Sequence, residues 1–161
     1  MMNRLFWGLF FVLLDLNIAV GRAVFEILPD FAGFYLLMKG MEALADRNAR
    51  FEKSRHVAFG AFLLSAVLYG ANLLNLEPMT KVGLWALELL CLAVFLGLQK
   101  TVVAEMGQEI RNLHVIAAVI LVLNHLTGWI PLVGSICAVA AAVISVVFLL
   151  AFRKEMKQSA A

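Results

Sequence analysis

The stretch RAVFEILPDFAGF, residues 22–34, places an arginine, two carboxylates, a proline and a glycine between two strongly apolar runs. The first run covers about residues 5–21, and the second begins at Pro29 and reaches about residue 44. Charged groups are costly inside lipid, so a cluster of them between two apolar runs predicts a connection at a membrane surface. Working outward from this stretch, we predict a chain built from membrane-spanning helices.

The composition agrees with a membrane protein. Of the 161 residues, 63% are hydrophobic and only 15% are charged, whereas about 25% are charged in a soluble domain. No linker divides the chain, which predicts a single transmembrane domain over residues 1–161. The net charge of +2, without a basic stripe, argues against nucleic acid as a partner. Cys91 and Cys137 lie within apolar runs and predict neither a disulfide nor a metal site.

Six apolar runs predict an all-α, polytopic bundle of six transmembrane helices. A span usually needs about 20 residues, and the second and fifth runs are shorter. Four spans with re-entrant segments is therefore the main alternative. A signal peptide is the alternative for the first run, but Asp15 in its core and Arg22 near the would-be cleavage region argue against it. The runs cover about residues 5–21, 29–44, 57–76, 82–103, 113–130 and 131–152.

Charge placement predicts the orientation. Only Arg22 and Lys81 fall outside when both termini are placed inside. This pattern follows the positive-inside rule, so we predict a multi-pass, N-in/C-in protein of the cytoplasmic membrane with the lipid bilayer as its partner. The Lys and Arg residues on the inner side are Arg4, Lys39, Arg47, Arg50, Lys53, Arg55, Lys100, Arg111, Arg153, Lys154 and Lys157.

The inner segment 45–56 has two interpretations. It is a solvated connector that enforces topology, or a short basic helix on the anionic leaflet with Phe51 as its apolar anchor. Pro29 and Pro131 suit the first positions of the second and sixth helices. Gly33 and Gly40 predict a surface of the second helix that packs closely against a neighbour.

The intramembrane polar side chains converge on the outer side in this topology. Were the first helix to continue beyond its span, Asp15, Arg22 and Glu26 would share one of its faces. One interpretation is a salt-bridge network that caps helices, and the other is an outward-facing polar pocket. Glu88 has no basic residue near it in sequence, so it is either paired with His125 or functional. The predicted binding residues are Asp15, Arg22, Glu26, Asp30, Glu88, Asn124 and His125.

Two further histidines, His56 and His114, lie at the inner boundary of the predicted spans. We expect both to face lipid headgroups. The sequence contains no GxGD, CxxC, HExxH, GxGxxG, P-loop or nucleophile-elbow pattern, so it predicts no catalytic residue, metal or cofactor, and no enzyme.

The run FEILPDFAGF, residues 25–34, followed by Gly40, Leu44 and FEKSR at residues 51–55, resembles a family of proteins. These are small bacterial integral membrane proteins, common in Gram-positive lineages, with an Ile-Leu-Pro-Asp-Phe-x-Gly-Tyr motif. The resemblance covers about residues 8–60, and Phe34 stands where the family has tyrosine. It implies a polytopic bacterial membrane protein and no particular activity.

We therefore expect a protein that binds or translocates a small solute or ion through the outward-facing polar cluster. The alternative is a non-transporting accessory, sensor or assembly subunit that docks a partner through its basic inner segment. A bundle of this size is small, which suits a homo-oligomer or membership of a larger membrane complex.

Overall fold

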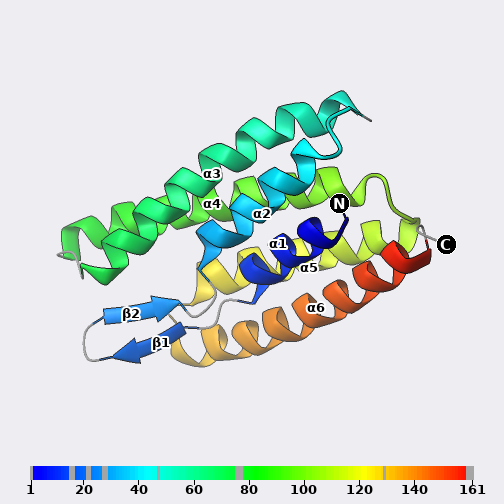
Figure 1. Ribbon diagram of the computed structural model, residues 1–161. Helices are drawn as coiled ribbons and strands as arrows, with labels where there is room; N and C mark the ends of the chain where they lie inside the picture. The colour runs from blue at the N-terminus through cyan, green and yellow to red at the C-terminus, as the bar shows by residue number, and fades with distance from the viewer. Residues whose placement is uncertain are drawn as a thin grey trace. The chain divides into compact units, whose positions relative to one another are not determined.

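The computed structural model describes residues 2–14, 17–20, 23–26, 29–46, 48–74, 78–128 and 130–158. Within these described residues, the chain forms six helices and one two-stranded sheet, which lies between the first and second helices (Figure 1). The elements are α1 (Met2–Leu13), β1 (Asn17–Val20), β2 (Ala23–Glu26), α2 (Asp30–Glu42), α3 (Ala49–Leu73), α4 (Pro78–Val103), α5 (Gln108–Thr127) and α6 (Pro131–Gln158).

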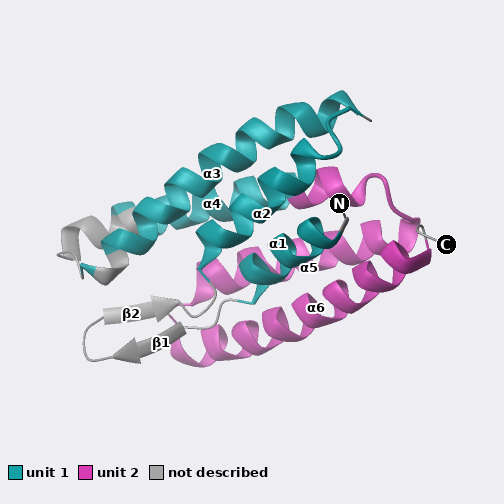
Figure 2. Cartoon of the chain, in the orientation of Figure 1, with its two compact units in different colours: residues 1–98 teal, residues 99–161 magenta. Residues whose placement is uncertain are grey.

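The chain divides into two compact units, Met1–Leu98 and Gln99–Ala161 (Figure 2). The division falls within α4, and each unit is described by itself. The expectation of one transmembrane domain stays a prediction, because two compact units can belong to one domain.

The first predicted span is wrong in its second half. The helix ends at Leu13, and residues 17–20 and 23–26 form antiparallel strands that pair Asn17 with Glu26 and Val20 with Ala23. A shared helical face for Asp15, Arg22 and Glu26 is therefore excluded. The missed signal is the dipeptide between the strands, because a two-residue connection that begins with glycine, here Gly21, is typical of a hairpin.

Helices α1 and α2 in unit 1 pack closely through glycines. A methyl group on Gly33 would lie 2.5 Å from Val12 Cγ2 and 2.9 Å from the Gly8 carbonyl oxygen. A methyl group on Gly40 would lie 2.5 Å from Leu5 Cδ2. The close-packing surface predicted from Gly33 and Gly40 is confirmed, because any side chain there would push the two backbones apart.

Aromatic ring contacts join α2 to α3 and to α4. Phe34 is buried and meets Phe95 of α4 edge to face, with ring centroids 6.2 Å apart. Phe31 lies 5.6 Å from the Tyr69 ring of α3, in the edge-to-face arrangement that aromatic pairs favour. Close contacts at glycines between α1 and α2, and ring contacts of α2 with α3 and α4, therefore hold unit 1 together.

The structure corrects part of each interpretation of the segment 45–56, although its helical character from Ala49 onward agrees with the second. Its residues from Ala49 onward are the first turns of α3, so it is not simply a connector. Phe51 is buried rather than exposed to a lipid surface. Asn48 was the missed signal: its Oδ1 accepts a hydrogen bond from the Arg50 backbone N–H at 2.9 Å, as an N-cap side chain does.

Helices α5 and α6 in unit 2 form an antiparallel pair. At one end the Gly107 N–H donates to Glu155 Oε1 at 3.2 Å. At the other end, a methyl group on Gly134 would lie 2.9 Å from the Thr127 carbonyl oxygen, so the two helices almost touch there. The contact requires glycine at residue 134.

Among the described residues, three helical segments are long and apolar enough to cross a membrane: Trp85–Val103 of α4, α5 and α6. The apolar side chains of α5 and α6 point largely outward, where Leu132 is 74% exposed. Other exposed apolar side chains of this pair are Val115, Ile116, Val119, Leu123, Ile136, Val139, Val143, Val147 and Leu150.

Candidate functional site

The predicted outer cluster is described only in part. Asp15 and Arg22 lie outside the described residues, and only the backbone of Glu26 is described, opposite Asn17 in the hairpin. Asp30 is the first residue of α2, where its carboxylate interacts favourably with the helix dipole. Its side chain is half-buried. Unit 1 thus contributes Asp30 at the start of a helix, as predicted.

Glu88 is half-buried on α4 and has exposed apolar neighbours in Leu87 and Leu90. Asn124 and His125 are half-buried near the end of α5. Glu88 belongs to unit 1, and the other two belong to unit 2. The pairing of Glu88 with His125 stays a prediction.

Three buried polar side chains distinguish unit 2. Gln99 and Ser145 are 0% exposed and His114 is 8% exposed. Gln99 Nε2, Gln99 Oε1, His114 Nδ1 and Ser145 Oγ have no hydrogen-bond partner among the residues that the structure describes. We call Gln99, His114 and Ser145 the buried polar trio. An unmade hydrogen bond at a buried polar atom costs about 1–3 kcal/mol, so this arrangement needs an explanation.

The helix register places His114 and Ser145 at similar depth. From the Gly107–Glu155 hydrogen bond, His114 lies about 10.5 Å along α5 and Ser145 about 15 Å along α6, at 1.5 Å per residue. Measured from the Thr127–Gly134 contact at the other end, His114 lies about 19.5 Å along α5 and Ser145 about 16.5 Å along α6. Measured from either end, the depths of Ser145 and His114 differ by less than one helical turn of about 5.4 Å.

The two residues also lie on the buried faces of their helices. On α5 the buried side chains are those of Ile110, His114 and Ala117, spaced three and four residues apart. On α6, Ser145 is buried together with Phe148, one turn further along. Because α5 and α6 pack on each other (Figure 2), the register places His114 and Ser145 at similar depth along this helix pair.

Gln99 is buried in the last turns of α4, on the same helix face as Phe95. Only residues 104–107 separate α4 from α5, and such short connections join antiparallel helices. Gln99 lies about 6 Å before the end of α4 and His114 about 9 Å beyond the start of α5. Lys100, next to Gln99, is close enough to His114 to interact with it electrostatically.

The chemistry of the trio is uncharged hydrogen bonding. The amide of Gln99 offers donors and an acceptor, the imidazole nitrogen of His114 offers one or the other, and the hydroxyl of Ser145 offers both. No Asp, Glu, Lys or Arg is buried among the described side chains. The described residues also contain no group of three or more His, Cys, Asp or Glu that would hold a metal ion.

Sequence reasoning missed most of the trio. His114 was expected to face headgroups, and this is wrong because its side chain is buried. Gln99 and Ser145 were not singled out, although each is a polar residue within an apolar helix. The available signal was spacing: Gln99 lies four residues after buried Phe95, and Ser145 four residues after buried Ala141.

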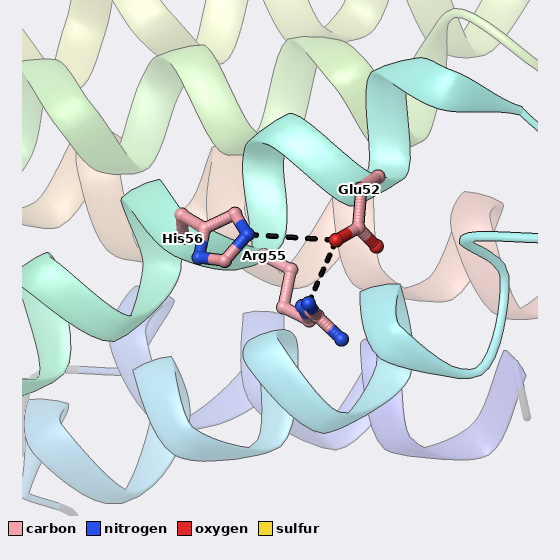
Figure 3. Close-up of polar contacts among 3 residues, drawn as sticks. All are labelled: Glu52, Arg55 and His56. Atoms are coloured by element: carbon pink, nitrogen blue, oxygen red, sulfur yellow. Dashed lines mark hydrogen bonds and ion pairs between the residues drawn. The ribbon is translucent and has the colours of Figure 1, made fainter.

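The basic start of α3 forms ion pairs of its own (Figure 3). Glu52 Oε1 accepts from Arg55 Nη2 at 2.7 Å and lies 3.5 Å from His56 Nε2. The His56 side chain is largely exposed, which is compatible with its expected place at a headgroup boundary. Exposed pairs of this kind contribute little to stability.

No protein-family model matches the chain, and no similar curated protein or solved structure was found.

Proposed function

We propose that this chain is a multi-pass protein of the cytoplasmic membrane with six spans and both termini inside. The inverted polarity of unit 2 carries the proposal: apolar side chains of α5 and α6 are exposed while the buried polar trio is enclosed. In water, such an apolar surface would associate or aggregate, whereas lipid solvates it. Of the other helices, α3 has 25 residues, enough in length for a full crossing, whereas α1 and α2 have 12 and 13 residues, fewer than the about 20 that a span usually needs.

Cysteine labelling tests this topology. In a background with Cys91 and Cys137 changed to serine, Lys81→Cys should react with an impermeant maleimide in intact cells. Lys157→Cys should react only after the cells are permeabilised. Labelling of Lys157→Cys in intact cells would overturn the N-in/C-in arrangement.

Within this membrane protein, we propose that a small solute or ion binds, or crosses, at the outward-facing cluster that includes Asp30, Glu88, Asn124 and His125. The support is energetic, since an ionisable side chain near the bilayer centre costs about 2.5–3.5 kcal/mol on the insertion scale. Such residues are typical of solute and ion pathways. Glu88, half-buried between exposed leucines, is the residue on which the proposal depends.

The test is a melting-temperature panel of ions and metabolites on the detergent-purified protein. A ligand at about 100 times its dissociation constant should stabilise the native state by about 2.7 kcal/mol. The proposal expects a hit that Glu88→Gln abolishes and Glu105→Gln, a change of the same kind at an exposed turn, leaves unchanged. A hit that survives Glu88→Gln would move the site away from Glu88.

An accessory function is the second candidate, favoured by the exposed basic residues at the start of α3. Arg50 and Lys53 are both exposed and would be available to a partner protein at the inner surface. Loss of function in the Arg50→Ala, Lys53→Ala double variant, with Glu88→Gln fully active, would favour this candidate over solute binding.

A further inference from the structure

Five aromatic rings form a continuous row along the contact between α2 and α3 of unit 1. The Phe62 ring has its centroid 6.2 Å from that of Phe59 and 6.0 Å from that of Tyr35. The Phe31 ring lies 6.5 Å from Phe62 and 5.6 Å from Tyr69, which ends the row. Tyr35 is 45% exposed and Phe59 is 48% exposed, whereas the other three are half-buried. These five residues, the ring row, therefore form a surface of unit 1 and not part of its core.

Charged side chains from three helices cluster at one end of unit 1. Lys39 Nζ donates to Glu42 Oε2 at 2.8 Å on α2. Glu42 also interacts electrostatically with Arg55 of α3 and with Arg4 of α1. Arg55 Nη2 in turn donates to Glu52 Oε1 at 2.7 Å (Figure 3). We call these five residues the unit 1 charge cluster, and it holds three cations for two carboxylates.

The ring row and the unit 1 charge cluster are continuous with each other. Lys39 follows Tyr35 by one turn of α2 and interacts with it electrostatically. Arg55 precedes Phe59 by one turn of α3. From Phe59 to Tyr69 the row extends about 15 Å along α3, which is also half the thickness of a bilayer's hydrocarbon core. The combined surface thus has one charged end and an apolar strip as long as one leaflet is deep.

We propose that this surface binds an anionic phospholipid, with the headgroup phosphate at Arg4, Lys39 and Arg55 and an acyl chain along the ring row. The surplus cation of the unit 1 charge cluster favours a lipid of net negative charge, because a zwitterionic headgroup brings a cation of its own. The exposed rings favour a lipid over a soluble anion, which would leave them uncovered.

The inference goes beyond the proposed solute site and rests on the proposed function only through the six-span topology. That topology places the unit 1 charge cluster on the inner side and the ring row within the bilayer. The lipid would therefore come from the inner leaflet, whose anionic headgroups attract basic residues.

Lys53 and Val57 of α3 provide matched controls. Each precedes its counterpart, Arg55 or Phe59, by two residues, which corresponds to about 200° around the helix. Lys53 is exposed, and Val57 is 48% exposed, as Phe59 is. Substitutions at the two control positions therefore remove a cation or an apolar group from the opposite side of α3.

The experiment is native mass spectrometry of the full-length, delipidated protein in a non-ionic detergent. The protein is titrated with phosphatidylglycerol or with phosphatidylcholine of the same palmitoyl and oleoyl chains, so that a difference in Kd reports the headgroup alone. The wild type should bind phosphatidylglycerol about tenfold more tightly than phosphatidylcholine.

The variants test the two parts of the surface separately. Arg55→Gln and Lys39→Gln should each weaken phosphatidylglycerol binding about fivefold and leave phosphatidylcholine binding unchanged, whereas Lys53→Gln should affect neither. Phe59→Ala should weaken the binding of both lipids about threefold because it shortens the ring row, whereas Val57→Ala should not.

Three results would overturn the inference. Equal affinity of the wild type for the two lipids would favour another membrane helix as the occupant of this surface. Equal effects of Arg55→Gln and Lys53→Gln would mean that lipid binding follows the overall charge of α3. Competition by glycerol 3-phosphate at the concentrations of the lipid would assign the cations to a soluble anion. The wild-type comparison decides even if Phe59→Ala does not fold.

The tests of the proposed function remain separate from this one, because lipid binding in detergent does not depend on orientation in a membrane. Selectivity for phosphatidylglycerol together with labelling of Lys157→Cys in intact cells overturns the topology alone. No selectivity, together with the expected labelling, overturns this inference alone. Selectivity that survives Glu88→Gln supports a lipid site independent of the outward-facing cluster.

Discussion

Helices α1 and α2 of unit 1 and helices α5 and α6 of unit 2 form helix pairs of opposite character. In the first pair, glycines bring two backbones together, and Leu9 and Leu37 fill the interface with no exposed surface. In the second pair, His114 and Ser145 are buried with unmade hydrogen bonds among the described residues. The first pair is optimised for packing, whereas the second retains polar groups that packing alone would eliminate. The difference separates a helix contact that close packing explains from one whose buried polar groups packing does not explain.

The largest expected effect is at the α1–α2 contact. Gly33→Ala should lower the free energy of unfolding by about 3 kcal/mol, because its methyl group would lie 2.5 Å from Val12 Cγ2 and near the Gly8 backbone. Denaturation in mixed detergent micelles measures it. Gly60→Ala is the control, since nothing lies within 4 Å of its added methyl group, and it should be neutral or slightly stabilising. A Gly33→Ala protein as stable as wild type would show that α1 and α2 can move apart to admit the methyl group without loss of stability.

A change of opposite sign is expected in unit 2. Gln99→Leu should raise the free energy of unfolding by about 2 kcal/mol, because it replaces an unsatisfied buried amide by an apolar group of similar size. The same denaturation assay measures it. A destabilised Gln99→Leu protein would mean that the amide is already satisfied, and the contrast between the units would disappear.

The two buried serines sharpen the comparison at a smaller scale. Ser65→Ala should cost about 1 kcal/mol because it removes the hydrogen bond to the Phe62 carbonyl oxygen, whereas Ser145→Ala should be neutral or stabilising by about 1 kcal/mol. Each substitution removes one buried serine hydroxyl, and only the Ser65 hydroxyl has a hydrogen-bond partner among the described residues. Equal costs would contradict the assignment of an unmade bond to Ser145.

The smallest effect is expected at the surface of unit 1. Arg55→Ala should change the free energy of unfolding by no more than about 0.5 kcal/mol, because its ion pair with Glu52 is partly exposed and screened. Thermal unfolding at low and high salt measures this change. The stability of the variant should depend less on salt concentration than that of the wild type. A loss several times larger would show that Arg55 does more than pair with Glu52.

Helix number and approximate position were predictable from the sequence, because apolar runs and prolines are local signals. Pro131 begins α6 as expected, and Pro29 precedes the first residue of α2. Pro78 begins α4, four residues before the predicted start of that span. The hairpin was missed because hydrophobicity, which dominated the prediction for residues 5–21, does not distinguish a strand from a helix in a short apolar run.

The sequence by itself determined that this is a helical chain with segments apolar enough to cross a membrane, and it pointed to Gly33 and Gly40 as a contact surface. These properties depend on composition and on spacing along one helix. Only the tertiary structure decided that Phe51 and His114 are buried, and that Gln99, His114 and Ser145 are enclosed without a described partner. The physical reason is that burial depends on which helix covers a side chain, and helices that are distant in sequence cover one another only once the chain has folded.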